Sequence, residues 1–233
     1  MTPPSADPTG TPYDGRVRPG GAPAVRELAH LRITKLAVDE QMANNVYLLG
    51  CRETGDQVLV DAADDAPRIL ELLGDAGLTT VVTTHQHWDH HRALADVVAA
   101  TGAQVVVGEP DAAAVTEQTG VAVDRAVTDG DEVRVGACTL RVVRVTGHTP
   151  GSIVLAYDDP EGHTHLWTGD SLFPGGVGNT FGDADAFATL LDDVEQKVFG
   201  AFEDDTWFYP GHGDDSTLGA ERPHLAEWRE RGW

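Results

Sequence analysis

Hydrophobic residues in this chain form short runs separated by turn-forming residues. Runs rich in β-branched and aromatic residues predict strands, while apolar residues spaced three and four positions apart predict helices. The predicted strands are LRITKLAV (31–38), NNVYLLG (44–50), QVLVDA (57–62), TTVVTTH (79–85), AQVVVG (103–108), EVRVG (132–136), CTLRVVRV (138–145), SIVLAYDD (152–159), HTHLWTGD (163–170) and TWFYPG (206–211). The predicted helices cover residues 64–74, 89–102, 111–118, 183–199 and 219–232.

The order of these elements predicts the fold. Each half of the chain contains several strands with flanking helices, and turns around 53–56 and 160–162 predict hairpins. This order of strands and helices favours an α/β fold in four layers (αββα), with two packed mixed β-sheets and helices outside. Residues 1–24 are rich in Pro, Gly, Ser, Thr and Asp and predict a flexible tail, which leaves 25–233 as one domain.

The chain has 38 acidic and 16 basic residues, a formal net charge of −22. Such a surface repels phosphate backbones, so we expect no nucleic-acid partner. No apolar run approaches the length of a membrane span and no signal peptide is visible, which predicts a cytoplasmic protein without a membrane partner. The two cysteines, Cys51 and Cys138, are predicted to be reduced and buried.

Candidate chemistry is concentrated in the segment THQHWDHH at residues 84–91. His85, His87 and Asp89 alternate, so on an extended segment they point to one side, and His90 follows where a helix is predicted to begin. Imidazole and carboxylate groups suit Zn, Fe, Mn or Co. One histidine could simply satisfy a hydrogen bond in the core, but four such groups in six residues after a strand predict a metal site.

Three further candidates also stand at predicted strand ends. They are His148 in TGHTPGS, Asp170 in TGDS and His212 in YPGHG, each preceded by a glycine that lets backbone approach a crowded centre.

Taken in order, H-x-H-x-D-H, G-H-T-P-G-S, G-D-S-L-F and Y-P-G-H-G resemble the signature of the metallo-β-lactamase-fold hydrolases. The likeness extends from about residue 31 to the end of the chain. Within that superfamily the chain is most similar to the glyoxalase II (hydroxyacylglutathione hydrolase) group, through GDSLFPGGVG at 169–178 and PGHGDDSTLGAER at 210–222.

The resemblance implies a dinuclear centre. One metal would take His85, His87 and His148, the second would take Asp89, His90 and His212, and Asp170 would bridge them. Two divalent ions are implied, with zinc favoured and iron or manganese open. A hydroxide that the ions share would attack a small-molecule thioester, and Asp89, as the catalytic residue, would orient it and handle its proton.

Other residues are weaker candidates. Asp61 resembles a family aspartate that supports the metal site, and Trp88 and Phe173 could line the substrate cleft. Asn179 stands where glyoxalase II enzymes usually carry a basic residue that holds glutathione, which leaves the thiol carrier open. Arg222 could contact an anion or form a surface salt bridge. Outside the site, His163 and His165 are expected to be exposed and His91 to be solvated or to cap a helix.

Other functions remain open. Persulfide dioxygenases share the fold and much of the signature but use a single iron, so an oxidoreductase is the main alternative. A metal-binding module without turnover is another, because fold and motif do not prove catalysis. A β-lactamase is disfavoured because those enzymes place Cys or His where Asp170 stands, and a nuclease is disfavoured by the charge.

Overall fold

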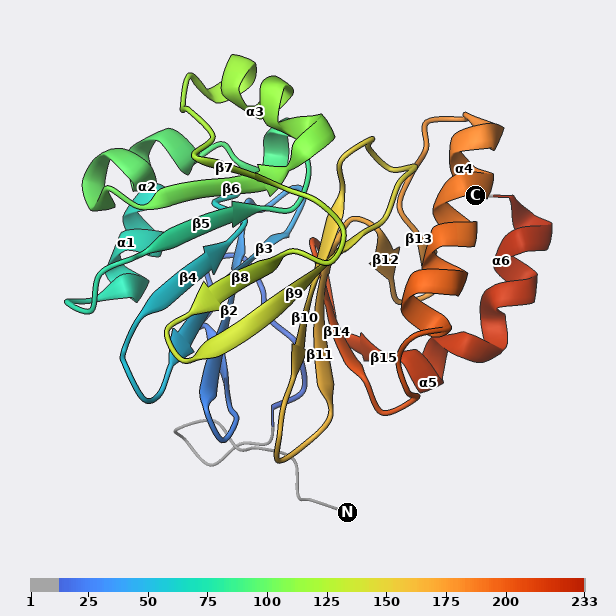
Figure 1. The fold of residues 1–233 in the computed structure, drawn as a ribbon, viewed down its shortest axis with the longest axis horizontal. Coiled ribbons are helices and arrows are strands. Elements are labelled where there is room, and N and C mark those ends of the chain that lie inside the picture. The colour runs from blue at the N-terminus through green and yellow to red at the C-terminus, as the bar shows by residue number, and fades with distance from the viewer. Residues whose placement is uncertain (1–12, 233) are drawn as a thin grey trace.

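In the computed structural model, which describes residues 13–232, two β-sheets pack face to face and helices cover their outer faces (Figure 1). The first sheet has seven strands in sequence order. They are β1 (Ala24–Glu27), β2 (Leu31–Val38), β3 (Asn44–Cys51), β4 (Gln57–Val60), β5 (Thr80–Thr83), β6 (Gln104–Gly108) and β7 (Arg125–Val127). Pairing is antiparallel from β1 to β4 and parallel from β4 to β7, so the sheet is mixed.

The second sheet has six strands in the order β15-β14-β11-β10-β9-β8. They are β8 (Glu132–Val135), β9 (Cys138–Arg144), β10 (Ile153–Asp158), β11 (Thr164–Gly169), β14 (Trp207–Pro210) and β15 (Ser216–Thr217). Only the β11–β14 pairing is parallel. A two-stranded ribbon of β12 (Leu172–Phe173) and β13 (Gly176–Val177) stands beside it.

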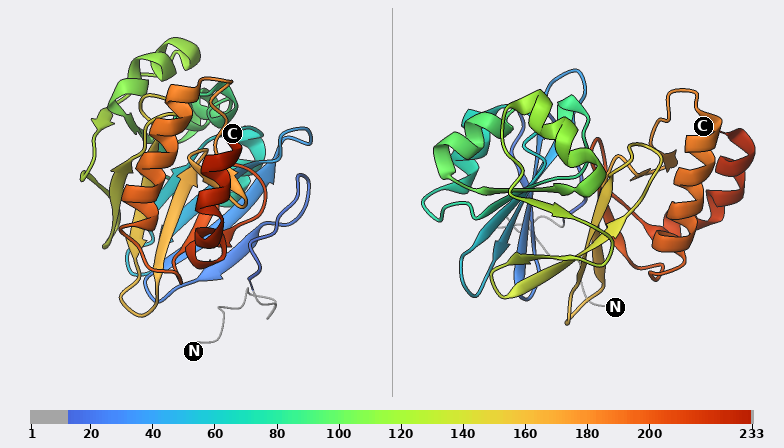
Figure 2. Two further views of the ribbon diagram at one scale, coloured as in Figure 1. Left: turned by 90° about the vertical axis from the view of Figure 1, so that its right-hand side faces the viewer. Right: turned by 45° about the horizontal axis from the view of Figure 1, so that its top comes forward.

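Helices are divided between the two outer faces (Figure 2). The first sheet is covered by α1 (Ala66–Leu73), α2 (Leu94–Thr101) and α3 (Ala112–Thr119). The second is covered by α4 (Ala184–Asp193), α5 (Leu218–Glu221) and α6 (Leu225–Arg231). The predicted four-layer αββα sandwich is confirmed.

Three apolar layers hold this arrangement together, one between the sheets and one under each set of helices. Strand β10 contributes to two of these layers, because successive side chains of a strand point to opposite faces of the sheet. Ile153, Leu155 and Tyr157 enter the layer between the sheets, while Val154 and Ala156 pack under α4 and α6.

Two predicted helices are less regular than their sequences indicated. The segment from 89 to 102 begins as a 3₁₀ turn at Trp88–His90, and α2 starts only at Leu94. The C-terminal segment contains a 3₁₀ turn at Arg222–His224 between α5 and α6, since Pro223 has no N–H to continue an α-helix. The helix predicted over 183–199 passes from α4 into a π-helix at Val194–Phe199.

The predicted flexible tail of residues 1–24 needs correction from residue 13 onward; residues 1–12 lie outside the described residues. Tyr13 is buried and its hydroxyl donates to Asp215 at 2.7 Å, while the Gly15 carbonyl accepts a bond from Lys35 at 2.7 Å. Strand β1 begins at Ala24. Specific partners in the fold therefore order a segment whose composition alone indicated mobility.

The prediction that His165 is exposed was wrong. His165 is buried because it lies on β11 between the sheets, with Nδ1 2.9 Å from the Tyr209 hydroxyl. His91 is buried rather than solvated, with Nε2 3.1 Å from the Gln86 carbonyl, and it occupies the C-cap position of the 3₁₀ turn at Trp88–His90, in keeping with the predicted capping role. Cys51 and Cys138 are free and buried, as predicted. Among residues 13–232, no helix combines the length and apolarity that a bilayer span requires.

Candidate metal centre

The segment that follows β5 carries four of the seven predicted ligands. After the buried strand ends at Thr83, the chain bends at His85 and Gln86, is extended at His87 and then turns into the 3₁₀ helix that holds Asp89 and His90. His85 and His90 are fully buried, and Asp89 is 6% exposed. A bend followed by a tight turn, rather than the extended segment that the alternation predicted, thus brings these four side chains together.

The other three predicted ligands come from strand ends in the second sheet. His148 follows β9, Asp170 follows β11 and His212 follows β14. These loops meet the β5 loop at one end of the sandwich, because neighbouring strands β11 and β14 run parallel and end together. All seven predicted ligands are brought together.

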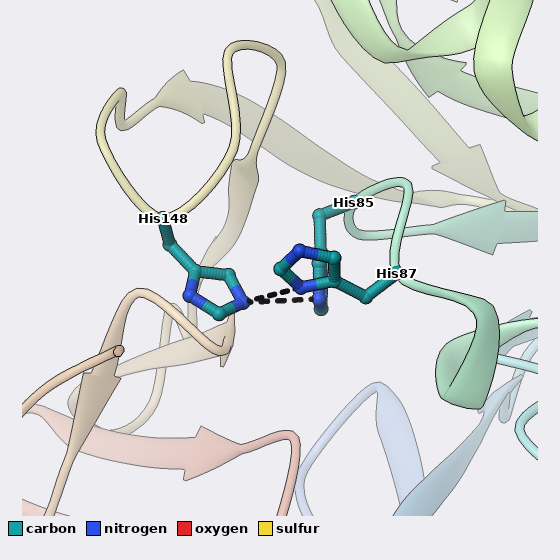
Figure 3. A group of neighbouring side chains, drawn as sticks. All are labelled: His85, His87 and His148. Carbon is teal, nitrogen blue, oxygen red and sulfur yellow. Dashed lines mark hydrogen bonds between the residues drawn. The ribbon is translucent and has the colours of Figure 1, made fainter. Parts of the chain in front are cut away.

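The seven side chains form two groups that share Asp170. In the first, His148 Nε2 lies 2.9 Å from His87 Nδ1 and 3.2 Å from His85 Nε2 (Figure 3). Its distance to Asp170 Oδ2 is 3.6 Å. The ring nitrogens of His85, His87 and His148 all lie within 4.8 Å of one another, a spacing that one metal ion could bridge.

The second group is built in the same way. His90 Nε2 lies 3.2 Å from His212 Nε2 and 3.5 Å from Asp89 Oδ2. The Asp170 carboxylate reaches this group too, with Oδ1 3.3 Å from His90 and Oδ2 3.5 Å from His212. Asp170 therefore faces both groups.

The donor set fits a pair of cations. Zinc–nitrogen bonds of about 2.0–2.1 Å in tetrahedral geometry put neighbouring ligand atoms about 3.3 Å apart, and the spacings here are of that size. The Asp170 Oδ1 atom is buried without a hydrogen-bond partner, although burying such an atom costs free energy unless something satisfies it. Five imidazoles and two carboxylates around one point therefore suit divalent metal ions.

Outer partners orient four of the five imidazoles. His90 Nδ1 lies 2.9 Å from Asp61 Oδ2, and His85 Nδ1 lies 3.0 Å from the Thr84 hydroxyl. The other two donate from Nδ1 to backbone carbonyls, His148 to Asn179 and His212 to Met42, both at 2.8 Å. Such contacts fix the ring orientation so that Nε2 faces the other candidate ligands.

Electrostatics differ between the groups. Burial lowers the pKa of His85, His87 and His148, to about 4 for His148, so these rings are neutral and ready to coordinate.

In the second group, neighbouring carboxylates outweigh the effect of burial on the pKa of the histidines. Burial opposes protonation of His90 and His212, but Asp170, together with Asp61 for His90 and Asp89 for His212, raises the pKa of both rings, to about 9 for His212. Negative charge concentrated here favours a bound cation.

Two glycines let backbone approach the centre. A Cβ atom at Gly211 would lie 2.2 Å from Asp170 Oδ1 and 2.6 Å from His90 Cε1. One at Gly178 would lie 1.9 Å from the Asp170 carbonyl oxygen. Larger residues at these positions would displace the ligands, which explains the glycines.

Of the other candidate residues, Trp88, Phe173 and Asn179 lie near the metal centre and Arg222 does not. Trp88 is 54% exposed beside the centre, and the Phe173 ring centroid lies 6.3 Å from that of His212. Asn179 is exposed and supplies the carbonyl that His148 binds. Arg222 binds Asp204 and the carbonyls of Phe199 and Phe202, and none of these groups belongs to the centre. Of the two roles predicted for Arg222, the structure therefore shows the salt bridge, which is formed with Asp204.

Sequence reasoning missed two further polar residues. Asn44 Nδ2 donates to Asp89 Oδ2 at 2.9 Å. The buried Asp111 accepts from Gln86 N at 2.9 Å and from Thr149 Oγ1 at 2.6 Å, which ties the two histidine loops together. Neither lies in a recognisable motif, and only their pairing in space reveals a role.

A sequence profile described as the metallo-beta-lactamase superfamily matches residues 40–212, which is most of the chain. The chain belongs to this superfamily. It is 33% identical over 171 residues to a hydroxyacylglutathione hydrolase of Polaromonas sp. strain JS666, covering 71% of this chain and 60% of the relative. It is 31% identical over 169 residues to the mitochondrial persulfide dioxygenase ETHE1 of Homo sapiens, covering 71% and 62%. The matched part thus spans less than two thirds of either relative.

Solved structures agree on the fold. The ETHE1 structure from Myxococcus xanthus superposes with a TM-score of 0.72 at 29% identity, covering 85% of this chain and 84% of that one. A B3 metallo-beta-lactamase, BLEG-1, superposes with a TM-score of 0.70 at 23% identity, covering 84% and 99%, a likeness that concerns the fold alone.

Proposed function

We propose that this protein is a metal-dependent hydrolase that uses two divalent ions, most simply zinc, to cleave a small-molecule thioester. The observation that carries the proposal is the pair of ligand groups that share Asp170. Hydroxyacylglutathione hydrolases among the relatives support thioester chemistry. The net charge of −22 supports a small substrate rather than nucleic acid.

When bound, a pair of cations lowers the pKa of a water molecule to about 7 and polarises a carbonyl, so no serine or cysteine nucleophile is required. Asp89 would be the catalytic residue, orienting that water and taking its proton. The Asn44 side-chain N–H, 2.9 Å away, holds Asp89 Oδ2, and the same oxygen lies 3.3 Å from His212. Asp61 keeps Nε2 of His90 directed at the centre.

A substrate panel with metal analysis tests the proposal. We expect close to two metal ions per chain and faster hydrolysis of S-acyl thiols than of lactones or β-lactams. Asp89→Ala and His90→Ala serve as inactive controls. Comparable rates on lactones, or no thioester turnover by fully loaded protein, would overturn the substrate assignment.

A persulfide dioxygenase is the second candidate, because a relative of that name matches in sequence and an ETHE1 structure matches in fold. It would use one iron and leave Asp89, His90 and His212 facing one another without an ion. Metal content after anaerobic purification, together with oxygen uptake on a persulfide, separates the two functions.

A further inference from the structure

Exposed large apolar residues lie in segments that border the candidate metal centre. Among residues 13–232, the exposed large hydrophobic residues are Met42, Trp88 and Phe181, at 38%, 54% and 73%. The Phe181 ring centroid lies 5.6 Å from that of His87, Trp88 follows His87 in the chain, and the Met42 carbonyl accepts the His212 bond. Large apolar residues that stay exposed beside a candidate site are typical of a binding surface. We call these three residues the apolar rim.

Phe181 is held in place despite an unfavourable backbone. Its φ of 56° lies in the left-handed region, which bulky residues rarely adopt. The Asn179 side-chain oxygen accepts the Phe181 N–H at 2.7 Å and so stabilises this conformation. The ring then stacks against His148, with centroids 6.4 Å apart and planes 30° apart. Strain that exposes an aromatic ring at a site points to a role in that site.

The cavity beside the Phe181 loop offers no cation to a carboxylate group. Every residue of 177–184 except Phe181 lines a cavity of about 430 Å³, and the one ionisable side chain in its lining is Asp183. Arg92, whose guanidinium lies 4.9 Å from the Trp88 ring centroid, is paired with Asp39 and Asp64. A thiol carrier with a carboxylate group would face Asp183 in this cavity. The cavity lining contains no lysine or arginine to pair with that group.

We propose that Phe181 and Trp88 bind an apolar, uncharged group of the substrate next to the scissile bond, and that Asn179 is the residue that positions Phe181. This inference rests on the proposed thioester hydrolysis. The apolar group belongs either to the acyl chain or to the thiol carrier, and both share the chemistry that the rim recognises. Carriers with several carboxylates are disfavoured.

Metal-loaded wild type is compared with Phe181→Ala, Asn179→Ala and Asn179→Asp. S-hexanoyl against S-acetyl N-acetylcysteamine tests the acyl chain, and the S-acetyl esters of 2-phenylethanethiol and mercaptosuccinate test the carrier. We expect both alanine variants to raise KM for the preferred apolar ester about tenfold, as for loss of one apolar contact, with kcat and metal content retained. Asn179→Asp keeps the acceptor oxygen and should restore KM toward wild type.

Calorimetric binding of 2-phenylethanethiol and mercaptosuccinate to the loaded protein gives a readout without turnover. Tighter binding of the apolar thiol that depends on Phe181 supports the rim even if no thioester is cleaved, in which case only the proposed function fails. Equal or tighter binding of mercaptosuccinate, or alanine variants with unchanged KM and binding, would overturn the inference while leaving thioester hydrolysis intact.

Discussion

Asp61 shows how one side chain organises the metal centre from outside it. It has a φ of 58°, unusual for a residue other than glycine. Its carboxylate compensates by accepting bonds from Thr84 N at 2.7 Å and Thr84 Oγ1 at 2.8 Å, and it faces His90 Nδ1 at 2.9 Å. The strand end, the ligand loop and the ligand itself thus depend on one buried residue.

Replacing Asp61 with alanine should weaken metal binding about 10- to 100-fold, the usual effect of removing the partner of a metal-binding histidine. His90 would lose the group that fixes its orientation. Competition with a chromophoric chelator measures the affinity, and Asp96→Ala, an exposed change on α2, is the control. Unchanged affinity in Asp61→Ala would remove this residue from the site.

His165 illustrates a different consequence of burial. It lies between the sheets, and burial followed by the charges of Arg26 and His163 lowers its pKa to about 2. The unfolded chain would bind a proton near pH 6.5, whereas the folded protein resists it. Stability from this residue is therefore complete above about pH 6.5 and is lost as the pH falls toward 2.

His165→Phe should flatten the decline of unfolding free energy between pH 6.5 and 4. The wild-type contribution to the slope is at most about 1.4 kcal/mol per pH unit. Urea unfolding at several pH values measures it, and the exposed His224→Phe is the control. Identical slopes in wild type and His165→Phe would show that another group governs acid sensitivity.

At the scale of elements, β2 anchors the loop that carries His212. Lys35 on β2 is fully buried, and its ammonium donates to Asp215 at 2.5 Å and to the Gly213 carbonyl at 2.8 Å. Tyr13 closes the pair from the N-terminal segment by donating to Asp215. A strand, a ligand loop and the segment before β1 are thereby joined by one ion pair.

Lys35→Met should destabilise the protein by about 3–5 kcal/mol, because it leaves the Asp215 carboxylate buried without a cation. The double variant Lys35→Met/Asp215→Leu should recover much of that loss, since it removes both charges. Urea unfolding of the two variants provides the comparison. If Lys35→Met lowers the unfolding free energy less than the double variant does, this explanation is wrong.

At the scale of the whole molecule, the candidate ligands connect both sheets. The loop after β5 belongs to the first sheet, and the loops after β9, β11 and β14 belong to the second. Ions held between them would link the two halves of the sandwich and would offset carboxylates in a chain whose net charge is −22. Metal binding and global stability should therefore be coupled.

Removal of the metals should lower the unfolding temperature, and their return should restore it. Ligands that bind only the folded state stabilise it by about 4 kcal/mol at a thousandfold excess over Kd. Thermal unfolding with chelator and after re-addition of zinc measures the effect. A His85→Ala/His148→Ala variant should show a smaller response, and an equal response would place the ions elsewhere.

The sequence alone determined the layers and the seven candidate ligands. Alternation of apolar residues is a local property of a strand, and H-x-H-x-D-H is a local spacing, so both are visible without coordinates. Structure that depends on packing was harder to predict: α2 starts later than its pattern indicated, and Tyr13 and Gly15 are bound by Asp215 and Lys35.

The tertiary structure decided which groups meet. The sequence showed only that Asn179 stands where glyoxalase II enzymes carry a basic residue. In the structure its side chain accepts the Phe181 N–H and its carbonyl accepts a bond from His148. The fold also engages Arg222 with Asp204, away from the predicted ligands. Backbone carbonyls and contacts between distant residues have no signature along the chain, because the fold alone sets their distance and direction.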